Sequence, residues 1–219
     1  MEIQSVSCVC FSPTGTSRTI VTTIAQGMQV EKIGMIDCTN RFQREGKSLA
    51  FNDEVVILAT PVYYGRIPEE VVPFLKTIIA NNTPVVLVVV YGNREYDDAL
   101  LELHDISVAQ GFIPVAGGAF VAEHSYSNPV RPIAHGRPDP VDIEKAKAFG
   151  FKIREKLAAI DSLNDIEVIN FPGNIPYIEP KNLQLIKQVR ATVSFTPETD
   201  PDKCTRCNLC VEIVSHESD

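Results

Sequence analysis

Short apolar runs alternate with longer segments of helical periodicity along the first 160 residues of the chain. The runs are rich in Val and Ile without strict alternation, a pattern that is typical of parallel strands buried on both faces of a sheet. Strands are predicted over residues 3–11, 32–37, 54–59, 85–91 and 113–121. Helices are predicted over residues 17–28, 68–79, 96–110 and 141–160.

The helix predicted over residues 68–79 has a good start signal. Pro68 stands at its first turn, where proline pre-sets φ, and Glu69 and Glu70 follow, where acidic side chains favour the positive end of the helix dipole. Five strands joined by helical crossovers predict an α/β fold with a doubly wound, five-stranded parallel sheet. A ligand crevice is expected beyond the carboxyl ends of the strands, at the topological switch point.

The periodicity weakens after residue 160, and proline recurs at positions 172, 176, 180, 197 and 201. Two parts are therefore predicted: a sheet domain over residues 1–160 and a mostly irregular C-terminal arm over residues 161–219. The arm is expected either to wrap the sheet domain or to lead to the cysteines near the C-terminus.

The composition of the 219 residues, 44% hydrophobic and 22% charged, is that of a soluble globular protein. No apolar run approaches the roughly 18–20 residues that span a bilayer, and the N-terminus lacks the order of a signal peptide, so a cytoplasmic protein without a membrane span is expected. The net charge of −8 comes without a cluster of Lys or Arg, which argues against nucleic-acid binding. This acidic balance suits docking to a basic partner or simply solubility.

A Ser/Thr-rich loop follows the first predicted strand and leads into the first helix. The proposed phosphate-binding residues in it are Ser12, Thr14, Gly15, Thr16 and Ser17. At a helix N-terminus, backbone N–H groups, hydroxyls and the helix dipole favour a phosphate. The Lys of a Walker loop and the G-x-G-x-x-G of a dinucleotide turn are both missing, which leaves a mononucleotide phosphate as the predicted guest. A turn that only caps the helix is the alternative.

This loop resembles the phosphate loop of flavodoxins, which reads Ser/Thr-x-Thr-Gly-x-Thr/Ser in the same place. The resemblance covers residues 1–160 and implies a flavodoxin-like sheet of strand order 2-1-3-4-5 with FMN as the cofactor. It also implies that the loops after the third and fourth strands enclose the flavin ring. The residues of these loops are Thr60, Pro61, Val62, Tyr63, Tyr64, Gly65, Tyr91, Gly92, Asn93 and Arg94.

Tyrosine is the expected stacking residue, because the chain has no Trp. An aromatic ring offers a flat apolar face to a flavin, and backbone N–H and C=O groups suit the polar edge of the flavin. Tyr64 and Tyr91 are favoured, and packing of Tyr63 or Tyr96 beneath a loop is the alternative. His124, after the fifth strand, is either a group at the flavin edge or a solvated loop residue. No catalytic residue is predicted.

The six cysteines fall into two groups. Cys8, Cys10 and Cys38 lie in apolar stretches and are interpreted as small buried residues. The second group has the spacing of iron–sulfur ligands, because it matches the first three positions of the bacterial ferredoxin run C-x2-C-x2-C-x3-C-P. Its members are Cys204, Cys207 and Cys210.

The ferredoxin run is incomplete in this sequence. Val214 stands where the fourth cysteine is expected, and Ser215 stands where the proline is expected. We therefore interpret the run as a truncated or degenerate module that holds a 4Fe-4S cluster only if a fourth ligand is supplied; zinc is a further alternative. With this run, the chain resembles the EFR-type flavodoxin–ferredoxin fusion proteins of anaerobes, a family of iron–sulfur flavoproteins.

The resemblance implies an FMN-dependent electron-transfer protein that exchanges electrons with a redox partner protein or a small-molecule donor or acceptor. Two other functions remain open. One is an NAD(P)H-dependent quinone or flavin reductase with the same fold, which requires an open face of the flavin ring. The other is a non-catalytic flavin-binding module that has lost its redox partner.

Overall fold

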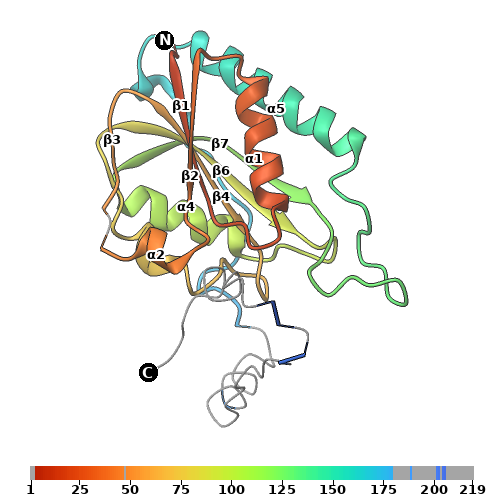
Figure 1. The fold of residues 1–219 in the computed structure, drawn as a ribbon. Helices are drawn as coiled ribbons and strands as arrows, with labels where there is room; N and C mark the ends of the chain where they lie inside the picture. Colours follow the sequence, from red (N-terminus) through yellow and green to blue (C-terminus); the bar gives the residue numbers. More distant parts are fainter. Residues whose placement is uncertain (1–2, 47, 180–187, 189–200, 203, 206–219) are drawn as a thin grey trace.

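The computed structural model describes residues 3–46, 48–179, 188, 201–202 and 204–205. Five parallel strands form its central sheet (Figure 1). In spatial order they are β2 (Lys32–Asp37), β1 (Ser5–Cys10), β4 (Val55–Pro61), β6 (Thr83–Tyr91) and β7 (Phe112–Val121). Numbered among themselves, these strands have the order 2-1-3-4-5, so the predicted doubly wound, flavodoxin-like fold is confirmed.

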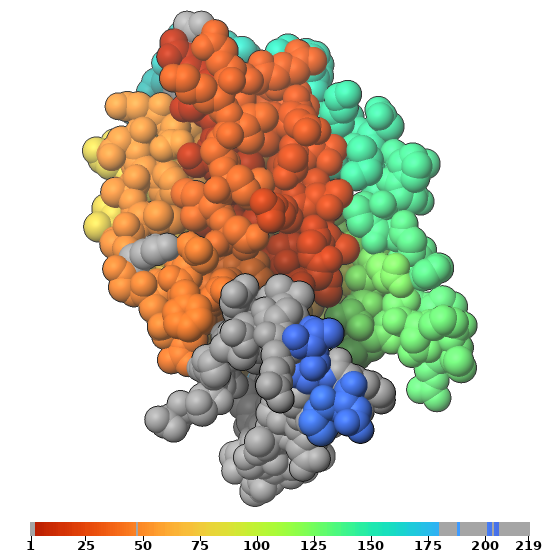
Figure 2. Space-filling model, in the orientation of Figure 1, coloured from red at the N-terminus to blue at the C-terminus, as the bar shows by residue number. Residues whose placement is uncertain are grey.

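Helices cover both faces of the sheet. On one face α1 (Thr16–Gly27) and α5 (Pro140–Ala158) lie side by side, as Figures 1 and 2 show. On the other face lie α3 (Val72–Leu75) and α4 (Ala99–Ala109). Four short elements were not predicted. They are α2 (Arg41–Arg44), the paired strands β3 (Ala50–Phe51) and β5 (Ile79–Ala80), and the 3-10 helix η1 (Leu163–Asp165).

The core is divided by the sheet into two layers, and β6 contributes to both. Its side chains alternate, so Val86 and Val88 pack under α1 and α5 while Val85 and Leu87 pack under α3 and α4. All four are fully buried. A strand that is buried on both faces reads as a continuous apolar run, which explains why the sequence pattern identifies it.

The helix predicted over residues 68–79 is wrong in extent, because only Val72–Leu75 is helical. Pro73 accounts for the difference. Its missing N–H would leave the carbonyl of Glu69 without an intrahelical partner, and its ring would collide with that carbonyl in a continuous helix. Proline is tolerated in the first turn, and the observed helix places it there. Beyond this helix the chain turns into the short strand β5.

The C-terminal arm is irregular over residues 166–179, as predicted, and it returns to the sheet domain. The ring of Phe171 packs against that of His104 on α4, with centroids 5.0 Å apart. A Cβ atom on Gly117 of β7 would lie 2.2 Å from the same phenyl ring, so glycine makes room for the arm. Among the helices that the structure describes, none has the length and apolar character needed to cross a membrane.

Candidate cofactor-binding site

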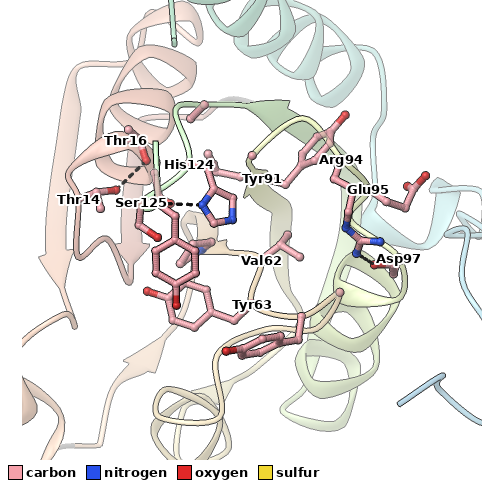
Figure 3. A pocket seen from close by; sticks show the side chains of 18 of the residues that line it. Thr14, Thr16, Val62, Tyr63, Tyr91, Arg94, Glu95, Asp97, His124 and Ser125 are labelled. Atoms are coloured by element: carbon pink, nitrogen blue, oxygen red, sulfur yellow. Dashed lines mark hydrogen bonds and ion pairs between the residues drawn. The ribbon is translucent and has the colours of Figure 1, made fainter. Parts of the chain in front are cut away.

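A pocket of about 720 Å³ opens beside the carboxyl ends of β4, β6 and β7 and the start of α1. The sequence predicts the ligand crevice in this place, and the volume is within the usual range for small-molecule sites. Figure 3 shows Thr14 and Thr16 at one end of the pocket, Arg94 and Asp97 at the other, and Val62 between them. The pocket therefore connects the Ser/Thr-rich loop with the loops that follow β4 and β6.

Most of the predicted site residues meet in the lining of this pocket. They are Thr14, Thr16, Ser17, Pro61, Val62, Tyr63, Tyr64, Gly65, Tyr91, Gly92 and Arg94. The predicted residues outside the lining are Ser12, Gly15, Thr60 and Asn93. Lining residues that the predicted set omitted include Glu95, Asp97, residues 122–126, Asn174, Ile178 and Glu179.

The Ser/Thr-rich loop is organised around the start of α1. The hydroxyl of Ser12 accepts a hydrogen bond from the backbone N–H of Arg18 at 3.0 Å, and so caps the helix instead of facing the pocket. Gly15 is the N-cap residue with φ 82°, a left-handed conformation that glycine adopts without strain. Other N–H groups of the first helical turn have no partner within the helix. Such N–H groups suit the binding of an anion at this end of the pocket.

Two buried hydroxyls in this region lack a hydrogen-bond partner among the described residues. They belong to Ser17 and Thr60, each only 1% exposed. Leaving a buried hydroxyl unpaired costs about 1–3 kcal/mol. Ser17 lies in the first turn of α1 and lines the pocket. An anion bound at this helix N-terminus would give Ser17 the acceptor that it lacks.

A tight turn over residues 63–66 forms the pocket wall after β4. The backbone N–H of Tyr63 donates to the carbonyl of Arg66 at 2.8 Å, and the N–H of Arg66 donates back at 3.0 Å. The central residues Tyr64 and Gly65 have φ values of 54° and 78°, as a type I′ turn requires. Because Tyr64 is not glycine, this conformation is strained, and such strain is common at binding sites.

The loop after β6 forms the facing wall. Asn93 and Asp97 have positive φ values of 62° and 44°, and Asp97 forms an ion pair with Arg94 (Figure 3). Tyr96 lies outside the pocket lining and packs edge-on against Tyr91, with ring centroids 5.5 Å apart. Tyr96 therefore supports Tyr91, and Tyr91 is the residue of this pair that faces the pocket.

His124, in the segment after β7, occupies a central position in the lining (Figure 3). Its Nδ1 atom accepts a hydrogen bond from the backbone N–H of Tyr126 at 3.0 Å, so the proton of the neutral ring is on Nε2. A Cβ atom on Gly92 would lie 2.4 Å from the imidazole ring, which explains the glycine at that position. The structure thus places His124 at the pocket, and its Nε2–H group is a donor.

Large apolar side chains remain exposed around this pocket. Tyr64 is 40% exposed, Tyr126 is 71% exposed and Ile178 is 60% exposed, and all three line it. Exposed apolar groups that gather at one concave site commonly mark a ligand-binding surface. The arrangement suits a flat, largely apolar ligand whose anionic end reaches the start of α1.

Acidic side chains dominate the charge of the described pocket-lining residues, with Glu95, Asp97, Glu123 and Glu179 against one cation, Arg94. Hydrogen bonds from the backbone N–H of Gly136 and from the ring of His135 lower the pKa of Glu123 to about 2. Glu123 is therefore ionised at neutral pH. A negative rim of this kind attracts cationic surfaces.

The three N-terminal cysteines are buried, as predicted, and none lines the pocket. Burial raises the pKa of Cys8 and of Cys38 to about 12 and that of Cys10 to about 11, so these thiols are unreactive at neutral pH. In the C-terminal run, Cys204 is exposed. Cys207, Cys210, Val214 and Ser215 lie outside the described residues, so the iron–sulfur prediction stays a prediction.

Comparison with solved structures identifies proteins of similar fold. Flavodoxin 2 from Bacillus cereus is 16% identical with a TM-score of 0.49, over 69% of this chain and 99% of that chain. A flavodoxin from Streptococcus pneumoniae TIGR4 is 19% identical with a TM-score of 0.47, over 71% and 98%. A Fusobacterium nucleatum flavodoxin bound to flavin mononucleotide is 15% identical with a TM-score of 0.47, over 70% and 99%.

A comparison with curated protein sequences gives no match. The comparison with family models gives a match over residues 8–104, which include the Ser/Thr-rich loop and both loops that face each other across the pocket. That family is described as the flavodoxin domain. The match shows that residues 8–104 are similar to the flavodoxin domain, and the strand order of the sheet is that of the flavodoxin-like fold.

Proposed function

We propose that the chain binds FMN in the pocket and acts as a flavodoxin-type electron-transfer protein. The observation that carries the proposal is the hydroxyl of Ser17, which is buried and unpaired among the described residues and belongs to a pocket-lining residue at the N-terminus of α1. A phosphate accepts hydrogen bonds from hydroxyl and backbone N–H donors there and is favoured by the helix dipole. Thr14 and Thr16 contribute further hydroxyls to the same end.

The rest of the pocket suits the isoalloxazine ring. Tyr64 and Tyr91 come from facing loops and offer flat apolar surfaces, and Ile178 adds an aliphatic one. The turn over residues 63–66 and the loop over residues 91–97 contribute to the pocket lining and would offer backbone groups to the polar edge of the ring. When bound, FMN supplies the capacity to accept and release electrons.

The chain's own residues would then hold the cofactor and set its surroundings. Apolar side chains exclude water from the ring, the Nε2–H group of His124 is a fixed donor beside it, and the acidic rim opposes additional negative charge in the pocket. These effects determine how readily bound FMN takes up electrons. A redox partner with a basic docking surface is the expected counterpart.

The finer assignment to the EFR-type flavodoxin–ferredoxin fusion family is part of this proposal and rests on the spacing of Cys204, Cys207 and Cys210. In that case the electrons exchanged with FMN pass through iron–sulfur chemistry, either in this chain with an added ligand or in a partner protein. A cytoplasmic location accords with the free thiols in the sheet domain.

The visible absorption spectrum of the purified chain, before and after saturation with FMN and desalting, tests the proposal. Retained flavin absorbance with close to one FMN per chain supports it, and a protein that retains no FMN refutes it. Addition of NADH or NADPH to the loaded protein then separates the two redox functions. Slow or absent bleaching supports electron transfer between proteins, whereas rapid bleaching indicates a reductase.

A further inference from the structure

The side chain of Asp98 connects the C-terminal arm to the pocket. Asp98 is fully buried immediately before α4, at 0% exposure. One carboxylate oxygen accepts hydrogen bonds from the backbone N–H of Asn174 at 2.7 Å and from its Nδ2 at 2.9 Å. The other accepts from the backbone N–H of Ile178 at 2.6 Å. Because a buried carboxylate is costly unless it is hydrogen-bonded, these contacts hold the arm in one place.

A second set of contacts fixes the arm beside Asp98. The guanidinium group of Arg66 forms two hydrogen bonds with Glu102, at 2.7 and 2.8 Å, and lies 4.2 Å from the ring centroid of Tyr177. The hydroxyl of Tyr177 donates to Asp105. Arg66 belongs to the turn that forms one wall of the pocket, so its contact with Tyr177 joins that wall to the arm.

Three residues of the arm line the pocket: Asn174, Ile178 and Glu179. The hydrogen bond to Asp98 fixes the orientation of the Asn174 carboxamide. Asp98, which binds Asn174 and Ile178, directly follows Asp97 in the chain, and Figure 3 places Asp97 at the end of the pocket away from Thr14 and Thr16. The arm therefore lies near the part of the pocket that suits a ring, and not near the part that suits a phosphate.

We propose that Asp98 is a positioning residue that holds residues 171–179 as a wall of the cofactor pocket, and that this wall contacts the ring of the bound flavin. The inference rests on the proposed function. It adds to the site a segment that lies beyond residues 8–104, the part matched by the flavodoxin domain. The contacts join residues 76 to 80 positions apart in the chain.

Fluorescence titration of the full chain with FMN and with riboflavin tests the inference. In Asp98→Asn the dissociation constants of both flavins are expected to rise by about tenfold, which corresponds to about 1.4 kcal/mol. The ratio of the two constants should stay unchanged, because the lost contacts are with the ring. Asn174→Ala, which keeps Asp98 and the backbone contacts, should weaken both flavins to a smaller extent. Asn170→Ala is the matched control, since Asn170 is an exposed asparagine of the same arm outside the pocket lining.

Hydrogen exchange of the backbone N–H groups of Asn174 and Ile178 gives a readout that a purely structural role would not change. FMN should slow their exchange in the wild-type chain and have little effect in Asp98→Asn. If both variants bind both flavins like the wild type, or if FMN leaves the exchange of these groups unchanged, the inference is wrong while the proposed function stands. If Asp98→Asn fails to fold, the dissociation constants of the two flavins for Asn174→Ala test the inference instead. A wild-type chain that binds no FMN overturns the proposed function and this inference together.

Discussion

The backbone N–H of Asp98 donates a hydrogen bond to the carbonyl oxygen of Gly65 at 3.0 Å. This contact joins the two loops that face each other across the pocket, the one after β4 and the one after β6. A Cβ atom on Gly65 would lie 2.4 Å from a carboxylate oxygen of Asp97, so the loops meet at a position where no larger residue fits.

Replacing Gly65 with Ala is therefore expected to weaken FMN binding and to destabilise the protein. Alanine must adopt the positive φ of 78° and displace Asp97. Backbone strain of this kind costs about 1–3 kcal/mol. Isothermal calorimetry with FMN and thermal unfolding of the FMN-free protein measure the two effects.

Gly46→Ala is the matched control for this experiment. Gly46 has a similar φ of 66°, but a Cβ atom there would meet nothing within 4 Å. Gly46→Ala should therefore share the backbone strain of about 1–3 kcal/mol without the collision, and it should leave the FMN affinity unchanged. Equal FMN affinities of Gly65→Ala and the wild type would show that the junction does not shape the site.

The close contact between α1 and α5 predicts a stability effect without a binding effect. A Cβ atom on Gly150 would lie 2.0 Å from the carbonyl oxygen of Ile24, so Gly150→Ala must push the helices apart. We expect a loss of about 1–3 kcal/mol in the free energy of unfolding, measured by urea denaturation. In Gly34→Ala the added methyl group comes no closer than 3.4 Å to Ser7, so this control should be nearly neutral. Equal losses in the two variants would contradict the packing argument.

Acid should release the arm, because the carboxylate of Asp98 holds it. Burial by itself raises the pKa of Asp98, but the hydrogen bonds from Ile178 and Asn174 and the charge of Arg66 outweigh it and leave this pKa below its usual value. A pKa that folding lowers contributes stability above the pKa of the unfolded chain, about 3.9, and that stability is lost as the pH falls through the folded value.

The unfolding temperature is therefore expected to fall between about pH 5 and pH 3, and to fall less in Asp98→Asn, which starts from a lower value at pH 7. Circular dichroism melts over this range provide the measurement. Asp142 also has a lowered pKa, owing first to its hydrogen bonds from Arg137, and contributes to the fall in both proteins. Parallel curves for the two proteins would rule out a contribution from Asp98.

The C-terminal cysteines are expected to hold little stable iron by themselves. Cys204, Cys207 and Cys210 supply three thiolates, and Val214 stands at the fourth position of the ferredoxin run. Anaerobic reconstitution of the full chain with iron and sulfide, followed by desalting and iron analysis, should give well below the four irons per chain of a complete 4Fe-4S cluster. Close to four irons with a stable broad absorption would mean that another residue or a second chain supplies the missing ligand.

The central strands and the position of the pocket are predictable from the sequence, because both follow from local patterns. The strand at Lys32–Asp37 has the predicted bounds, and the Ser/Thr-rich loop lies at the start of the first helix as expected. Buried parallel strands read as apolar runs, and their connectivity places the ligand site. Pro73 is a local signal as well, and it limits the helix predicted over residues 68–79 to Val72–Leu75.

Features that depend on distant contacts could not be predicted in this way. The hydroxyl of Ser12 caps α1, whereas that of Ser17 stays unpaired among the described residues. The sequence alone does not show which of the two serines caps the helix. The contribution of Asn174 to the pocket depends on Asp98, 76 positions earlier in the chain. An irregular, proline-containing segment carries no periodicity that would indicate its partner.

The ratio of the dissociation constants for riboflavin and FMN tests the central claim most directly, since the two ligands differ only in the phosphate. Riboflavin is expected to bind about 10- to 100-fold more weakly than FMN, the effect of losing about 1.5–3 kcal/mol of hydrogen bonding to a charged group. Ser17→Ala should narrow this difference, whereas Ser107→Ala should preserve it, because Ser107 is equally buried on α4 and already bonds to the carbonyl of Leu103. Equal affinities for riboflavin and FMN in the wild-type chain would contradict the assignment of a phosphate site to the start of α1.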